Sequence, residues 1–218
     1  MDEAPTKRRR ATRGICAVCQ GEFGKRAIVA HLEKHLAEQD SVLGEHVPRL
    51  HLLVESAFGP EYWLHLDVRA DATLKKLDTF LRGIWLECCG HLSQFTDDKG
   101  RYGLGMNKIG MSRKIGEALT PGMTFFHEYD FGSTTELKGR VLAVHEGSPA
   151  KAPVLLLARN NAPEMLCEVC GKPAELLGMD YKGEYHEICE ECADEEMQEA
   201  LLPVVNSPRA GVCGYTGP

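Results

Sequence analysis

The chain has 218 residues, of which 43% are hydrophobic and 26% charged, which are ordinary values for a globular protein. No apolar stretch approaches the roughly 18 residues that span a bilayer, and the chain opens with charged residues instead of the apolar segment of a signal peptide. Length and composition therefore argue against any membrane association, and they favour a cytoplasmic chain with one core and small appended modules.

The nine cysteines indicate metal binding through their arrangement. Six of them form three C-x-x-C pairs, and the total is odd. In a chain that opens without a secretion signal, such pairing favours metal ligation in a reducing compartment over a disulfide framework.

Residues 1–13 are predicted to be a basic tail. They contain five basic residues against two acidic ones and show no apolar periodicity, so we expect them to be disordered when free. The tail would either contact nucleic acid through phosphates or remain a solvated segment. Its basic residues are Lys7, Arg8, Arg9, Arg10 and Arg13.

Residues 14–40 are predicted to form a two-Cys/two-His zinc finger with the ligands Cys16, Cys19, His31 and His35. Two cysteines on a tight turn and two histidines one helical turn apart supply the tetrahedral donor set that zinc prefers. Eleven residues separate the two pairs, one fewer than usual, so a helix with solvated histidines beside an unrelated thiol pair is the alternative. A single finger contacts only about three base pairs, and no base-reading set is evident here, so sequence-specific DNA binding is not expected.

Residues 48–160 are predicted to form an α+β core domain. Two β-rich runs, 51–58 and 62–70, flank Gly59-Pro60 and are typical of a hairpin. A helix is expected next over 74–87, because apolar residues recur there at helical spacing and give one buried face. Those residues are Leu74, Leu77, Leu81, Ile84 and Trp85.

Four more strands are expected in this domain, with a short helix near 113–119. The strands are predicted at 91–96, 123–132, 134–147 and 154–160. Two strands, a helix and further strands follow the order of a β-grasp-like mixed sheet packed on one main helix. The fold class is therefore predicted to be α+β.

Residues 164–202 are predicted to form a separate four-Cys zinc module, a zinc ribbon or treble clef. The spacing is C-x2-C-x18-C-x2-C, with the ligands Cys167, Cys170, Cys189 and Cys192. A helix over 190–202 is expected to follow the second pair. Between residues 164 and 199, twelve acidic residues stand against two basic ones. This module would repel nucleic acid, so a structural role or the docking of a partner protein is expected.

The remaining cysteines allow a third site. Cys88, Cys89 and His91 follow the long predicted helix, and Cys213 lies in the C-terminal tail, residues 203–218. These residues form either a core thiol pair beside a hydrogen-bonded histidine, a third metal site, or a set of reactive redox cysteines. A Gly-rich end with a lone cysteine frays unless it is tied down, so we expect the tail to pack on the core with Cys213 beside the other three.

Three segments resemble a known family. They are YWLHLDVRADATLKKLDTFLRGIWLECCGHLSQF, FFHEYDFGSTTEL and NSPRAGVCGY. With them the chain resembles the Ri-plasmid open-reading-frame-three-like family, often labelled insertion-element passenger proteins of TnpR type, over roughly residues 50–160. It resembles a zinc-bearing subgroup over the whole chain. The resemblance implies a β-grasp-like α+β domain and association with mobile elements, without a settled activity.

The most specific mark of that family is Tyr129-Asp130-Phe131-Gly132. Asp130 is interpreted either as a turn former, which is common for Asp before such a pair, or as a carboxylate that faces a cleft. The serine nucleophile among clustered arginines that a serine recombinase needs is not found in the sequence.

These patterns predict a non-enzymatic adaptor or interaction protein that binds two zinc ions, with a third possible. We expect the adaptor to bind a protein partner, and it would contact nucleic acid, if at all, through the basic tail. A first alternative function is a metal- or thiol-dependent enzyme. A second is a nucleic-acid-binding regulator that uses residues 7–35. The enzyme would use a cleft lined by Cys88, Cys89, His91, Asp130 and Cys213.

Overall fold

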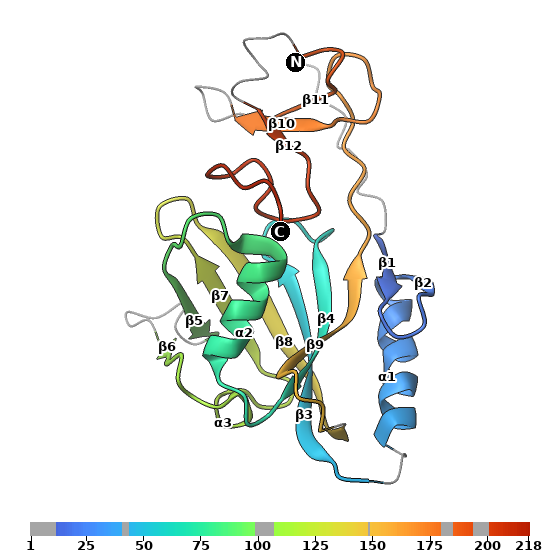
Figure 1. Ribbon diagram of the computed structural model, residues 1–218, viewed down its shortest axis with the longest axis vertical. Helices are drawn as coiled ribbons and strands as arrows, with labels where there is room; N and C mark the ends of the chain where they lie inside the picture. Colours follow the sequence, from blue (N-terminus) through green and yellow to red (C-terminus); the bar gives the residue numbers. More distant parts are fainter. Residues whose placement is uncertain (1–11, 41–43, 99–106, 148, 180–184, 194–200) are drawn as a thin grey trace, which may run out of the picture.

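The computed structural model describes residues 12–40, 44–98, 107–147, 149–179, 185–193 and 201–218 (Figure 1). Within these residues nine strands form one large sheet in the order β2-β1-β9-β4-β3-β8-β7-β5-β6, and three form a small sheet in the order β11-β10-β12. The large sheet consists of β1 (Arg13–Cys16), β2 (Glu22–Gly24), β3 (Val47–Ser56), β4 (Trp63–Arg69), β5 (Ser93–Asp97), β6 (Lys108–Ile109), β7 (Thr124–Tyr129), β8 (Thr135–Gly147) and β9 (Val154–Asn160). The small sheet consists of β10 (Leu176–Met179), β11 (Tyr185–Ile188) and β12 (Leu202–Pro203).

The helices are few and short. They are α1 (Ala27–Asp40), α2 (Leu74–Leu81), α3 (Ile115–Ala118) and the π-helical turn η1 (Arg82–Leu86). None of the helices that the described residues form combines the length and apolarity needed to cross a bilayer.

The predicted α+β class is confirmed, but the predicted mixed sheet is wrong. Every strand pairing within the described residues is antiparallel. Several neighbouring strands, such as β3 and β4, follow one another through short turns, and a short turn joins only antiparallel strands. The β-grasp likeness stays a prediction.

The central hairpin β3–β4 separates two covered faces. Its strands pair across the Gly59-Pro60 turn as predicted, with Leu52 opposite Leu66. Successive side chains point to opposite faces, so Leu52 and Leu66 lie in the core under α2, whereas His51 and His65 lie on the face that α1 covers. Because both faces are covered, β4 is buried from Trp63 to Val68.

A second helix packs on the sheet where the sequence predicted one main helix. Helix α1 covers the face opposite α2 and packs against Trp63 of β4. Strand β1 pairs with β9, with Gly14 opposite Asn160, so residues 14–40 extend the large sheet and are not a separate appendage. A side chain at Gly14 would collide with the Trp63 ring and the Arg159 carbonyl, which explains glycine at this contact. The buried face of α1 is Ile28, Leu32 and Leu36.

The helix predicted over 74–87 forms as α2 followed by η1. Thr73 is its N-cap residue, and Leu74, Leu77, Leu81 and Trp85 are buried as predicted. Leu86 is buried as well, although it directly follows Trp85. The π-helical turn departs from the 3.6-residue periodicity of the prediction, and the buried face at this end of the helix includes a residue that the periodicity did not select.

The four-Cys module is built on the small sheet. Strand β12 returns to β10, with Pro203 opposite Leu176, and the tail then runs between the small and the large sheet, drawn in red in Figure 1. The helix predicted over 190–202 lies mostly outside the described residues, and the described residues 190–192 form a turn.

Candidate metal centres

The first ligand set lies where β1, β2 and α1 meet. Cys16 ends β1 and Cys19 follows in a turn that closes through the bond from the Gln20 amide to the Cys16 carbonyl. His31 and His35 lie one turn apart on α1, and each of the four residues offers a ligand atom within 4.8 Å of the others. Cys19 Sγ lies 3.3 Å from His31 Nε2. The structure thus brings together all four residues that the spacing selected.

His35 shows why these atoms suit a cation. Its Nε2 is buried and has no hydrogen-bond partner among the described residues. Its Nδ1 lies 3.6 Å from Glu38 Oε2, so the carboxylate orients the ring with Nε2 toward the thiols. Burial lowers the pKa of the neighbouring His31, which favours the neutral imidazole that binds metals. A buried nitrogen without a donor is costly unless an ion takes that place.

The second set lies at the two turns of the four-Cys module. Cys167 and Cys170 form one turn, closed by the bond from the Gly171 amide to the Cys167 carbonyl, with Gly171 in the left-handed region at φ +72°. Cys189 and Cys192 form the other turn, and all four sulfurs lie within 4.8 Å of one another. Cys170 Sγ lies 3.6 Å from Cys189 Sγ.

The four thiols cannot all ionise without a cation. Backbone N–H groups around Cys167 lower the pKa of its thiol to about 6, whereas hydrogen bonds with Cys170 and Cys189 raise the pKa of Cys192 to about 12. Neighbouring thiolates repel one another, so one loses its proton easily and another holds it. A divalent ion at the centre removes this conflict.

The third set joins the end of η1 to the tail. Cys89 Sγ lies 3.0 Å from His91 Nε2, 3.6 Å from Cys88 Sγ and 3.8 Å from Cys213 Sγ. His91 Nε2 lies 3.3 Å from Cys213 Sγ. The predicted return of Cys213 to this corner is therefore found in the structure, and these four atoms also lie within 4.8 Å of one another.

Arg209 is the residue that sequence reasoning missed at this corner. Its side chain is fully buried, and Nη2 donates to Asp130 Oδ2 at 2.8 Å and to Cys88 Sγ at 3.5 Å. Nη1 donates to the Ser133 carbonyl and to Thr135 Oγ1, both at 3.0 Å. The available signal was a single charged residue in the otherwise uncharged tail segment NSPRAGVCGY.

Asp130 forms the turn and also pairs with Arg209 of the tail. It adopts a left-handed conformation at φ +64°, and its Oδ1 accepts a bond from the Gly132 amide, which is the turn-forming interpretation. Its Oδ2 accepts from Arg209 and lies 3.5 Å from His91 Nε2. Hydrogen bonding from the Arg209 guanidinium holds the pKa of this carboxyl below its usual value. The carboxylate is thus engaged by the tail instead of facing an open cleft.

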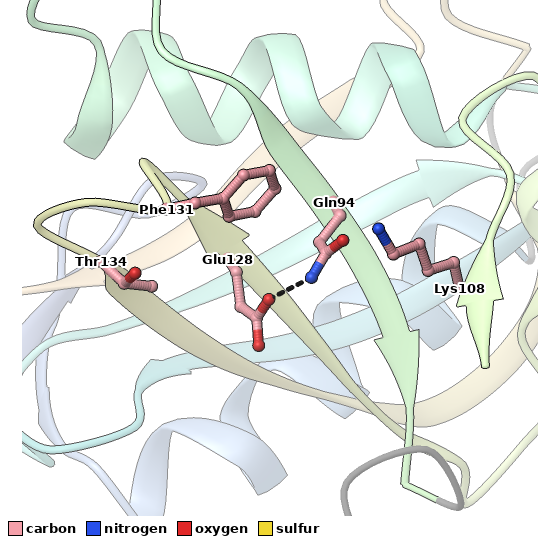
Figure 2. A pocket seen from close by; sticks show the side chains of 5 residues that line it. All are labelled: Gln94, Lys108, Glu128, Phe131 and Thr134. Carbon is pink, nitrogen blue, oxygen red and sulfur yellow. Dashed lines mark hydrogen bonds between the residues drawn. The ribbon is translucent and has the colours of Figure 1, made fainter. Parts of the chain in front are cut away.

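Two cavities are lined by residues that belong to none of the three ligand sets, although Ile15, Ala17 and Gln20 of the second are chain neighbours of Cys16 and Cys19. One, of about 320 Å³, lies on the outer face of β5, β6 and β7 (Figure 2). Figure 2 shows Gln94, which donates to Glu128, between Phe131 and Lys108. The other, of about 490 Å³, lies beside β1, β9 and the tail. No cysteine or histidine lines either cavity, so neither joins a metal set to a substrate-sized space.

A buried polar chain ties the end of α1 to the sheet. Arg49 Nε donates to Asp67 Oδ2 at 2.7 Å, and His145 lies between Asp67, at 3.2 Å, and Asp40, the last residue of α1, at 3.0 Å. Burial acts to lower the pKa of His145, but its hydrogen bonds with both carboxylates outweigh this and raise the pKa above its usual value. These ion pairs therefore hold the C-terminal end of α1 to the sheet, whereas the candidate ligands His31 and His35 lie in the first two thirds of the helix.

No family model and no curated protein matches this chain. A crystal structure of a protein of unknown function from Methanosarcina mazei Go1 is similar to it, with a TM-score of 0.45 and 18% identity over 59% of this chain and 76% of that one.

Proposed function

We propose that this chain is a zinc-binding adaptor without catalytic activity, in which two zinc ions hold the finger and the four-Cys module in shape. One observation carries the proposal: each of the two sets supplies four ligand atoms from the chain itself, all within 4.8 Å of one another. A catalytic metal site keeps one position open for water or substrate, whereas a site with four protein ligands is closed and structural.

Zinc fits these donors best. A tetrahedral zinc ion with bonds of about 2.3 Å to sulfur and about 2.0 Å to nitrogen separates two sulfurs by about 3.8 Å and a sulfur from a nitrogen by about 3.5 Å. Cys170 Sγ and Cys189 Sγ are 3.6 Å apart, and Cys19 Sγ and His31 Nε2 are 3.3 Å apart. These spacings support an ion of zinc's size and preference for sulfur and imidazole.

The packing of the finger favours an adaptor over a sequence reader of DNA. A finger reads bases by placing its helix in the major groove, but one face of α1 is buried against the sheet. Its exposed residues include Glu33 and Glu38, which would repel phosphates. Arg13 is paired with Glu22 at 3.1 Å. Nucleic-acid contact would therefore rest on residues 7–10, which lie outside the described residues.

The four-Cys module supports a protein partner. Leu166, Val169 and Tyr185 expose large apolar side chains there, and Val169 is 71% exposed. Glu168 and Glu191 are also exposed there, where they pair with His186 and Lys172, and the acidic excess of residues 164–199 surrounds them in the sequence. An exposed apolar group within an acidic rim suits a partner that presents an apolar contact among basic residues. The resemblance to mobile-element passenger proteins suggests that this partner belongs to such an element.

Two measurements test the proposal. Elemental analysis of protein purified without added metal should give zinc, at two or more equivalents per chain; iron in its place would contradict the assignment of the metal. A protein partner should copurify with the wild-type chain, and Val169→Ser should abolish this copurification. Phe58→Ser is the matched control, because Phe58 is 74% exposed on the core. Equal loss in both variants would argue against docking on the four-Cys module.

A further inference from the structure

The C-terminal tail, residues 203–218, is the one described segment that connects the four-Cys module to the third ligand set. It begins in β12, which pairs with β10 in the small sheet. It then packs on the core, where Ser207 Oγ donates to the Trp85 carbonyl at 2.6 Å and Arg209 is buried beside Asp130. The tail thus leads from the small sheet to the core, with Ser207 and Arg209 between β12 and Cys213 (Figure 1).

The tail reaches the ligand set through an unusual backbone. Gly211 and Gly214 have φ of +76° and +68°, and Cys213 between them has φ of +51°. A left-handed conformation is disfavoured for a residue with a Cβ, and it persists only where the surroundings hold it. This bend aims Cys213 Sγ at Cys89 and His91, at 3.8 and 3.3 Å.

The third set differs from the other two in exposure and in chain connectivity. The third set has two exposed ligands, Cys89 and Cys213, and no buried one, whereas each of the other two sets has one exposed cysteine and at least one buried cysteine. Three of its ligands come from one short segment, 88–91, and only the fourth comes from the tail. Loss of an ion here would release the tail alone, without unfolding a module.

We propose that Cys88, Cys89, His91 and Cys213 bind a thiophilic divalent cation that acts as a removable latch between the tail and the core. The sulfur–sulfur distances of 3.6 and 3.8 Å match the edge of about 3.8 Å for a tetrahedral zinc ion. Binding displaces the thiol protons, and three thiolates on a divalent ion leave one negative charge. The Arg209 guanidinium, which donates to Cys88 Sγ as well as to Asp130, places a positive charge directly beside these thiolates.

This latch goes beyond the two structural zinc ions and does not depend on them. Because both exposed cysteines are open to solvent, a competing chelator or thiol reagent can reach the ion directly. Removing the ion frees Cys213 and leaves the tail held by its hydrogen bonds, the Arg209–Asp130 ion pair and the packing of the buried Tyr215. The latch thereby couples the supply of thiophilic metal to the mobility of the end of the tail.

The test compares full-length wild type with Cys213→Ser, and it uses Ser207→Ala as the matched control. Ser207→Ala removes a tail–core hydrogen bond but no metal ligand. After loading with zinc, native mass spectrometry should show one ion fewer in Cys213→Ser than in the other two proteins. Hydrogen exchange should show loss of tail protection in Cys213→Ser, and also in wild type treated with a mild chelator.

Each other outcome overturns the latch. Equal ion counts in wild type and Cys213→Ser would exclude the metal site. If wild type also has two free thiols fewer than expected, a Cys89–Cys213 disulfide holds the tail in place of a metal ion. Loss of the ion without loss of tail protection would exclude the coupling. Cys16→Ser and Cys189→Ser report on the structural ions separately, so failure of those two sites cannot be mistaken for failure of the latch.

Discussion

Arg209→Met is the substitution that should most weaken the packing of the tail on the core. The guanidinium is completely buried and makes four hydrogen bonds, one of them to the Asp130 carboxylate at 2.8 Å. Breaking a buried ion pair by removing one partner typically costs about 3–5 kcal/mol, because the other charge stays buried without compensation. Methionine keeps most of the side-chain length, so the change isolates the loss of charge and hydrogen bonds.

The expected loss is measurable by urea denaturation of zinc-saturated protein. Trp63 and Trp85 are both fully buried, so tryptophan fluorescence reports unfolding of the core. A loss of about 3–5 kcal/mol also predicts a decrease in Tm of about 10 °C for a chain of this size.

Arg69→Met is the matched control. Arg69 pairs with Asp71 through two hydrogen bonds, but this pair is on the surface, so the substitution should change stability little. If Arg209→Met unfolds within about 1 kcal/mol of wild type, the hydrogen bonds of Arg209 do not stabilise the tail.

Four further outcomes are expected. Gly139→Ala should destabilise the chain by about 1–3 kcal/mol, because a methyl group there meets the ring of the facing Phe125, whereas Gly83→Ala, which meets open space, should not; thermal unfolding measures both. Cys189→Ser should abolish hydrogen-exchange protection in β10 and β11, because structural zinc supplies the folding energy of such modules, and retained protection would refute this. His145 has a raised folded-state pKa, so its protonated form stabilises the fold. This contribution is complete below the unfolded pKa of about 6.5 and is lost as the pH rises through the folded pKa. An unfolding free energy that stays constant across that pH range would contradict the ion pairs with Asp67 and Asp40. Neutralising residues 7–10 should reduce the slope of log K against log salt concentration for any DNA binding by up to about 0.9 for each phosphate that the tail no longer neutralises. An unchanged slope would exclude the basic tail as the segment that contacts DNA.

The features that follow from local sequence could be predicted. The spacing of Cys16, Cys19, His31 and His35 selects a set of residues that a turn and a helix bring together without help from the rest of the chain. The β3–β4 hairpin likewise depends on two β-rich runs and one turn. Even the return of Cys213 follows from a local argument, because a tail with a lone cysteine among glycines needs an anchor.

The features that depend on distant pairings could not be predicted. The sequence of residues 14–40 describes a self-contained finger, and nothing local reveals that β1 pairs with β9 across about 145 residues of chain. The buried chain from Arg49 through Asp67 and His145 to Asp40 has the same origin, because it joins three strands and a helix only after the sheet has formed. Arg209 was missed because a charged residue in a tail is normally solvated, and only the position of Asp130 makes its burial favourable.

Native mass spectrometry of the intact chain tests the central claim most directly, since it counts the metal ions in folded protein. We predict zinc in the finger and in the four-Cys module, so that Cys16→Ser and Cys189→Ser each lower the count by one ion and the double variant lowers it by two. A wild-type chain that carries no metal and still protects α1, β10 and β11 from hydrogen exchange would contradict this claim, because the two modules would then fold without the ions that are proposed to hold them.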